Sequence, residues 1–197
     1  GNGNFGQQQI ISILVDGARA VYAADLDNDG DMDILSASTI DHKIAWYEND
    51  GNGNFGQQQI ITTNATTAVS AYATDLDNDG DIDVLSAYSH TQIAWYENDG
   101  NGNFGQPQII TIDVIAINSV YAADLDNDGD IDVLSASEND SKIAWYENND
   151  NGNFEIQHII VVAANGANSV HAADLDNDGD IDVLSASYWD DKIAWYE

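Results

Sequence analysis

The sequence predicts an all-β fold, a β-propeller of four-stranded antiparallel blades with four blades in the chain. Two observations carry this expectation. Four copies of one segment follow each other at spacings of 49 or 50 residues, marked by a Phe and a Trp in each copy: Phe5, Phe55, Phe104 and Phe154, and Trp46, Trp95, Trp145 and Trp195. Each copy also contains short apolar runs separated by Asn, Asp and Gly. Repeats of this length, made of four short strands, are typical of propeller blades.

The four strands of one repeat are clearest in the third copy. We expect them at 119–124 (SVYAAD), 132–137 (DVLSAS), 142–147 (KIAWYE) and about 154–161 (FEIQHIIV). An Asn/Asp/Gly cluster separates the third strand from the fourth and supplies the positive φ values that a tight hairpin needs. No long stretch has a 3.6-residue period, so we expect almost no helix.

The third strand is apolar on both of its faces. Ile143, Ala144, Trp145 and Tyr146 are consecutive, which predicts a sheet packed between two others. We therefore expect the four repeated Trp residues in the core.

The organisation predicted for the chain is one domain, 1–197, of four repeats. The first blade spans 19–61, the second 69–110 and the third 118–161. The chain opens with a fourth-type strand, 1–11, and closes with a third-type strand. We expect 1–11 to act as a closing outer strand that completes the fourth blade, 168–197, and hides two sheet edges. Because the chain begins at Gly1, we expect a processed, excised or engineered piece.

The charge balance excludes several classes of partner. With 4 Lys and Arg against 35 Asp and Glu, the formal net charge is -31. Nucleic acids and anionic membranes are recognised by basic surfaces, so we expect neither as a partner. No apolar run is long enough to predict membrane insertion, and the absence of cysteine excludes disulfides and thiol catalysis.

An Asp-x-Asp-x-Asp-Gly-Asp-x-Asp segment follows the first strand of every repeat. In each copy the first, second, third and fifth carboxylates can converge on one cation, the fourth residue can offer its backbone carbonyl, and Gly allows the sharp turn. Hard oxygen ligands in a flexible loop suit calcium, about one ion per repeat and four per chain. The candidate metal ligands are Asp25, Asp27, Asp29, Asp31 and Asp33; Asp75, Asp77, Asp79, Asp81 and Asp83; Asp124, Asp126, Asp128, Asp130 and Asp132; and Asp174, Asp176, Asp178, Asp180 and Asp182.

The loop differs from an EF-hand, because its twelfth position is Ser36 rather than Glu and a strand follows. Two carboxylates about 4 Å apart repel by roughly 4 kcal/mol at an effective dielectric near 20. A bound divalent ion relieves this repulsion, so we expect the metal to act as a folding ligand.

The Asp-x-Asp-x-Asp-Gly loop, the Asp-Val-Leu-Ser-Ala-Ser strand and the Gly-Asn-Phe-Gly turn resemble FG-GAP/VCBS repeats. These are the blades of integrin-α-type propellers, of related bacterial surface proteins and of fungal lectins. The resemblance covers essentially the whole chain. It implies a calcium ion between the first and second strands of each blade, with all five aspartates of the loop as ligands.

The number of blades departs from the resemblance, which implies seven in a ring. Four blades can close as a small monomeric ring, or two chains can join as a homodimer with eight. We favour the dimer, because blades adapted to wide rings must twist and wedge more to close at four.

A candidate ligand face lies opposite the calcium loops. The connections expected there vary between repeats: 39–42, 89–92, 138–141 and 188–191 after the second strands, and 14–19, 64–69, 113–118 and 163–168 before the first strands. Variable loops on a rigid scaffold are typical of binding surfaces. The best candidates for stacking on a sugar ring are Tyr88, His90, Tyr188 and Trp189.

No repeated catalytic arrangement stands out, so we expect a protein that is not an enzyme. The favoured function is a calcium-dependent, lectin-like adhesion module for carbohydrate or protein ligands. The alternatives are a structural, duplicated or engineered scaffold without a ligand and, less favoured, a polysaccharide-active enzyme. Because millimolar calcium is available outside cells, we expect a secreted or cell-surface location.

Overall fold

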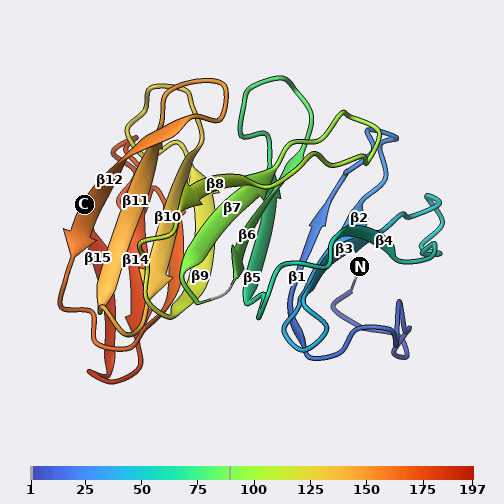
Figure 1. Ribbon diagram of the computed structural model, residues 1–197, viewed down its shortest axis with the longest axis horizontal. Coiled ribbons are helices and arrows are strands. Elements are labelled where there is room, and N and C mark those ends of the chain that lie inside the picture. Colours follow the sequence, from blue (N-terminus) through green and yellow to red (C-terminus); the bar gives the residue numbers. More distant parts are fainter. Residues whose placement is uncertain (1, 89) are drawn as a thin grey trace.

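The computed structural model describes residues 2–88 and 90–197, which form fifteen strands in four antiparallel sheets standing side by side (Figure 1). We call these sheets blades 1 to 4. Blade 1 contains β1 (Ala18–Ala24), β2 (Asp33–Ser38), β3 (Lys43–Tyr47) and β4 (Gln59–Thr62). Blade 2 contains β5 (Ser70–Thr74), β6 (Asp83–Tyr88), β7 (Gln92–Tyr96) and β8 (Gln108–Thr111). Blade 3 contains β9 (Ile117–Ala123), β10 (Asp132–Ser137), β11 (Lys142–Asn148) and β12 (Phe154–Val161). Blade 4 contains β13 (Ala167–Ala173), β14 (Asp182–Ser187) and β15 (Lys192–Tyr196).

Within each blade the strands pair in sequence order, and the same register recurs. Leu134 lies opposite Trp145 in blade 3, as Leu35 lies opposite Trp46 in blade 1. The expected all-β fold is confirmed, and the described residues contain no helix that is long and apolar enough to cross a membrane.

The apolar core lies between neighbouring blades. The trailing face of a blade packs on the next blade through Leu and Ala of the second strand and Ile and Trp of the third: in blade 2, Leu85, Ala87, Ile93 and Trp95. The leading face of a blade packs on the preceding blade through the loop before the first strand and through that strand: in blade 3, Val114, Ile117, Val120 and Ala122. We call the contact between a trailing and a leading face a junction. The strand that is apolar on both faces is explained by this stacking.

The first strands of the blades lie next to each other, in the order β1, β5, β9 and β13. A ladder of aromatic rings joins them. The ring centroids of Tyr22, Tyr72, Tyr121 and His171 follow each other at 4.4, 4.9 and 4.4 Å. The four blades therefore form an arc around their first strands.

The connections sort onto the two opposite ends of the strands. The turn after the second strand lies against the loop before the first, since Thr39 N donates to Gly17 O at 2.9 Å and Tyr188 N to Gly166 O at 2.8 Å. At the other end, the loop after the first strand meets the hairpin between the third and fourth strands, where Asn49 N donates to Asp33 Oδ1 at 2.8 Å.

The described residues do not show the expected closure of blade 4 by the first residues of the chain. The described part of the segment 1–11 forms no strand, and blade 4 has three strands instead of four. Figure 1 places the N-terminal segment and β15 on opposite sides of the view. The expectation that all four repeated Trp residues are buried also needs correction. Trp46 and Trp95 are buried, but Trp195 is 47% exposed because no other blade packs on it among the described residues.

Buried amide side chains tie the blades together, and removing one should destabilise the fold. The Asn148 side chain donates to the carbonyls of Leu76 in blade 2 and Ile131 in its own blade, at 2.8 and 3.0 Å. Asn148→Ala leaves both carbonyls without this donor, and we expect the free energy of unfolding to fall by about 2–4 kcal/mol. Urea unfolding measures this. Asn101→Ala, in an exposed hairpin, is the control and should cost less than about 1 kcal/mol; equal losses would contradict the role of the inter-blade bonds.

Candidate functional site

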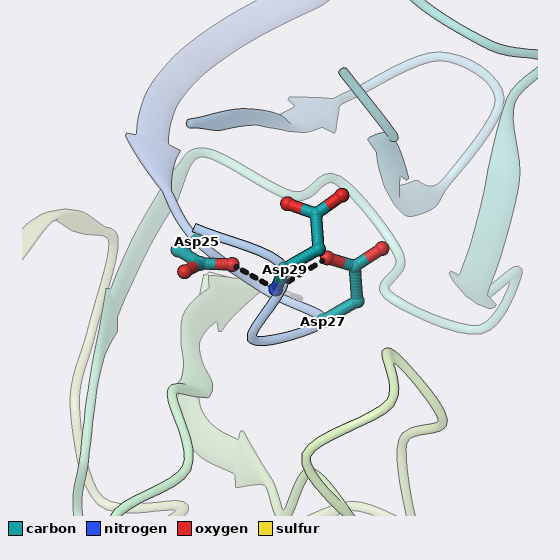
Figure 2. Close-up of side chains that lie close together, drawn as sticks. All are labelled: Asp25, Asp27 and Asp29. Atoms are coloured by element: carbon teal, nitrogen blue, oxygen red, sulfur yellow. Dashed lines mark hydrogen bonds between the residues drawn. The ribbon is translucent and has the colours of Figure 1, made fainter. Parts of the chain in front are cut away.

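The Asp-rich loop after each first strand is shaped by its own carboxylates. In blade 1, Asp25 accepts hydrogen bonds from the backbone N–H of Asp29 at 3.1 Å and of Gly30 at 2.9 Å. Figure 2 shows the Asp25 and Asp27 carboxylates both turned toward the backbone nitrogen of Asp29. Asn28 and Gly30 have φ values of 59° and 93°, in the left-handed region that Asn and Gly adopt most readily. The sequence therefore folds this loop so that its carboxylates gather in a small cluster.

Each blade brings three carboxylates together. In every loop one oxygen from each of three aspartates lies within 4.8 Å of the others, an arrangement that could hold a metal ion. The first two aspartates of the loop belong to all four groups, and the third member is the third or the fifth aspartate. The four groups are Asp25, Asp27 and Asp29; Asp75, Asp77 and Asp83; Asp124, Asp126 and Asp132; and Asp174, Asp176 and Asp178.

The fifth aspartate of each loop is buried at the start of the second strand. In blade 2, Asp83 accepts hydrogen bonds from the backbone N–H of Leu76 and of Asn98, both at 2.9 Å. Burial raises the pKa of Asp83 to about 7, although both N–H donors oppose the shift. Burial likewise raises the pKa of Asp132 to about 6. Burial thus disfavours the charged form of these carboxylates, and a cation bound nearby would stabilise that charged form.

The fourth aspartate takes no part in these groups. In blades 2 to 4 its side chain accepts a hydrogen bond from the Asn of the preceding loop, as Asn28 Nδ2 donates to Asp81 Oδ1 at 2.6 Å and Asn127 Nδ2 to Asp180 Oδ1 at 2.8 Å. The sequence reasoning missed this inter-blade contact. Its signal is the Asn that follows the second aspartate of all four loops.

The donor set fits a hard divalent cation. Asp75 Oδ1 is buried and has no hydrogen-bond partner among the described residues, although the equivalent oxygens of Asp25 and Asp124 accept hydrogen bonds from backbone amides. Burial and the neighbouring Asp79 charge raise the pKa of Asp77. The loop thus offers one oxygen without a hydrogen-bond partner and several carboxylates that repel one another. These are hard oxygen ligands, which calcium prefers.

The four candidate ligand-face residues lie in different surroundings. Tyr88 is only 5% exposed and packs in the core between blades 1 and 2, so that little of its ring reaches the surface. His90 is exposed, and its carbonyl accepts the backbone N–H of Ala116 at 2.6 Å. Ser89, at the start of the same connection, lies outside the described residues.

Tyr188 and Trp189 form an exposed aromatic pair in the turn between β14 and β15. They are 70% and 67% exposed, and their ring centroids lie 4.8 Å apart at an interplanar angle of 83°. Trp189 Nε1 donates to Glu138 Oε1 of blade 3 at 3.0 Å, and Asn118 Nδ2 donates to Glu138 Oε2 at 3.1 Å. The indole is thus held in place while much of its surface stays open.

Solved structures with a similar fold include proteins of different kinds. One is a lectin of Agrocybe aegerita, described as specifically recognising non-reducing terminal N-acetylglucosamine, with 20% identity and a TM-score of 0.65; the match covers 86% of this chain and 46% of the lectin. Another is the V. cholerae biofilm matrix protein Bap1, with 23% identity, a TM-score of 0.56 and coverage of 92% and 26%. A third is BBS1N in complex with ARL6DN, with 10% identity, a TM-score of 0.60 and coverage of 91% and 56%. The chain thus spans between about a quarter and somewhat over half of the length of these proteins.

No curated protein matches the chain. The sequence itself matches the FG-GAP-like repeat in four overlapping segments, 1–36, 25–86, 75–135 and 124–185. Successive segments overlap at the Asp-rich loops, so that the match runs through every candidate metal centre. The chain therefore belongs to the FG-GAP-like repeat family.

Proposed function

We propose that this protein is a calcium-binding propeller module that binds ligands without catalysis. The observation that carries the proposal is the recurrence of a three-carboxylate group at the same place in all four blades. Chance acidic turns would not share one register. Calcium when bound supplies a positive charge that offsets the repulsion among these carboxylates. The chain's own contribution is the set of backbone N–H donors, such as that of Gly30, which hold the carboxylates in position.

Bound calcium would organise the loop without reaching the opposite end of the blades. The first, second and third or fifth aspartates are the ligands best supported by position, while the fourth contributes its side chain to the neighbouring blade. We therefore propose that calcium has a structural role, and that ligand binding takes place on the face of the variable connections. Millimolar extracellular calcium suits loops of this kind, which favours a secreted or surface location.

The ligand we favour on that face is a carbohydrate. The exposed Tyr188 and Trp189 rings offer apolar surfaces of the kind on which sugars stack, and Glu138 and Asn118 add polar groups beside them. The likeness to a lectin that recognises terminal N-acetylglucosamine supports a glycan over a protein ligand. The wider role would be adhesion to a glycan-coated surface or matrix.

A glycan array probed in calcium tests the ligand. We expect binding to at least one glycan class, and a loss of at least about tenfold in affinity with Trp189→Ala, since removing a well-packed contact residue costs more than about 1.4 kcal/mol. Ile40→Ala is the matched control, because Ile40 occupies the same turn position in blade 1 and is 63% exposed. Binding unchanged by Trp189→Ala would rule out this site. No binding to any glycan or matrix protein would favour a structural scaffold, and release of unsaturated sugars would indicate an enzyme.

A further inference from the structure

The two ends of the arc expose faces whose equivalents are buried at every junction. On the trailing face, Ile193 of blade 4 is 85% exposed, whereas its equivalents Ile44, Ile93 and Ile143 are all 0% exposed. On the leading face, Val21 of blade 1 is 73% exposed, whereas the residues at that position in the other blades are at most 7% exposed: Ala71, Val120 and Val170. Both end faces thus have the composition of a protein interior.

Asn side chains form hydrogen bonds across the junctions between blades 1 and 2 and between blades 2 and 3, and the equivalent Asn of blade 1 has no acceptor in another blade among the described residues. Asn98 and Asn148 each donate across a junction, to the carbonyls of Leu26 and Leu76, at 2.8 Å. The side chain of Asn49, at the equivalent position in blade 1, donates only within its own blade among the described residues. Blade 1 is therefore built to hydrogen-bond to a blade before it.

A contact between a hairpin glycine and the tryptophan of the preceding blade is also incomplete at the two ends of the arc. A Cβ on Gly102 would lie 2.8 Å from Cη2 of Trp46, and a Cβ on Gly152 equally close to Cη2 of Trp95, so each hairpin glycine sits against the Trp of the preceding blade. Gly53, at the equivalent position in blade 1, has nothing within 4 Å of its Cβ position. Among the described residues, no other blade covers Trp195, which is 47% exposed. Gly53 and Trp195 are two halves of one missing junction.

The N-terminal segment already lies where the fourth strand of a preceding blade would lie. Between blades 2 and 3, the fourth strand of one blade and the hairpin of the next line a small hollow together with a Trp: Trp95, Gln108, Ile109, Gly152, Asn153 and Phe154. The N-terminal segment and the hairpin of blade 1 line a hollow at the equivalent positions: Gln9, Ile10, Ile11, Gly53, Asn54 and Phe55. The Trp that completes the second hollow, at the position of Trp195, is absent from it.

The outer edge of β15 is the matching acceptor. In the other three blades the Trp of the third strand lies opposite a fourth-strand residue: Gln59, Gln108 or His158. β15 has no neighbour on that side among the described residues. The repeat spacing places Gln9 opposite Trp195 and Ile10 opposite Ala194, as Ile60 lies opposite Ala45 in blade 1. An unpaired edge of this kind favours the addition of a strand.

We propose that two copies of this chain join head to tail into a closed ring of eight blades. In each of the two junctions, the trailing face of blade 4 packs on the leading face of blade 1 of the second copy. The segment 2–14 of each copy adds the missing fourth strand to β15 of the other. This arrangement buries Ile193, Val21 and Trp195, gives Asn49 its acceptor and leaves no exposed edge on β15. It rests on the packing of the blades and does not depend on the ligand proposed above.

Two copies, rather than one, follow from the shape of the arc. The three junctions within the chain leave β15 and the N-terminal segment on opposite sides of the molecule (Figure 1). The chain corresponds to 46% of the lectin and 56% of BBS1N, which share its fold, so that about two copies match the length of either. Repeating the same junction in a second copy is therefore what closes the ring, through interfaces that are identical by two-fold symmetry.

The first test is the mass of the full chain in solution, at physiological ionic strength and in calcium. We expect twice 21.3 kDa at micromolar concentrations. Val21→Glu and Ile193→Glu each place a charge in both junctions and should weaken association by at least about 100-fold. Ile112→Glu is the control, since Ile112 is 71% exposed and belongs to neither end face of the arc, and it should stay a dimer. A native chain of 21.3 kDa overturns the proposal, and masses that grow beyond the dimer with concentration overturn the closed ring.

A second test uses the two monomeric variants together. A mixture of Val21→Glu and Ile193→Glu chains has one junction with both charges and one junction with neither. We expect the mixture to recover the dimer mass that each variant alone has lost, because one native junction remains. Failure to recover it, with both variants folded by near-ultraviolet circular dichroism, contradicts head-to-tail packing.

A cysteine pair tests the donated strand, which is possible because the chain has no cysteine of its own. Ile10→Cys with Ala194→Cys places two thiols on opposed residues of the proposed strand pair, where Cβ atoms lie about 4.5–5.5 Å apart. Oxidation should give a covalent dimer on a denaturing gel. Ile11→Cys with Ala194→Cys points to the other face of the strand and should not link. A linked monomer would mean closure within one chain and would overturn the exchange.

Discussion

Adding saturating calcium to the metal-free protein should raise its melting temperature by at least about 10 °C. At a calcium concentration 100 times the dissociation constant, each occupied site adds about 2.7 kcal/mol to the free energy of unfolding. For a domain of this size, 1 kcal/mol corresponds to about 2–4 °C. The physical reason is the repulsion within each three-carboxylate group, which nothing else in the loop neutralises. Calorimetric melting with calcium, and again with a chelator, measures the shift.

Removing one carboxylate from a three-carboxylate group should change the melting temperatures of the metal-free and the calcium-bound protein in opposite directions. Asp77→Asn relieves repulsion in the metal-free protein, so its melting temperature in chelator should be equal to or higher than that of the native chain. In calcium the same variant should melt lower and bind one ion fewer by titration calorimetry. Asp113→Asn, an exposed site outside the loops, removes the same charge and should leave the stoichiometry unchanged. A chelator without effect on melting would contradict the metal role altogether.

Gly152→Ala should be among the most destabilising single-methyl changes in the chain. Gly152 has φ of 67°, and a Cβ there would run into the six-membered ring of Trp95 across the junction. The left-handed backbone costs a non-glycine residue about 1–2 kcal/mol, and overpacking adds about 1–3 kcal/mol. We expect a loss of about 2–5 kcal/mol in urea unfolding.

A double-mutant cycle separates the two causes. Trp95→Phe removes the ring atoms that the new methyl group meets, at a cost of its own. In that background Gly152→Ala should cost about 1–3 kcal/mol less, because only the backbone strain remains. Additive losses would mean that the backbone conformation alone accounts for the effect.

The repeat pattern of the sequence was sufficient to predict the strands and the loops, because both form through contacts between residues close in sequence. The alternation of apolar runs with Asn/Asp/Gly clusters recurs four times, and short-range hydrogen bonds such as Asp25 to Gly30 form within one loop. The grouping of aspartates could also largely be predicted from the sequence, since residues two apart in a tight turn must face one another. The inter-blade contact of the fourth aspartate could not, because its partner Asn lies about fifty residues away in the preceding blade.

Burial in the finished arc was decided only by the tertiary structure. Trp46 and Trp195 stand in the same local sequence, yet one is buried and the other is 47% exposed, because burial depends on whether another blade packs on the ring. Val21 and Val120 likewise occupy equivalent positions, but Val120 is 5% exposed at a junction and Val21 is 73% exposed at the end of the arc. A repeat determines by itself how one blade folds and where its acidic loop lies. How the ends of the array are covered depends on neighbours that no local pattern encodes, and that is where the strongest exposed apolar faces of this protein remain.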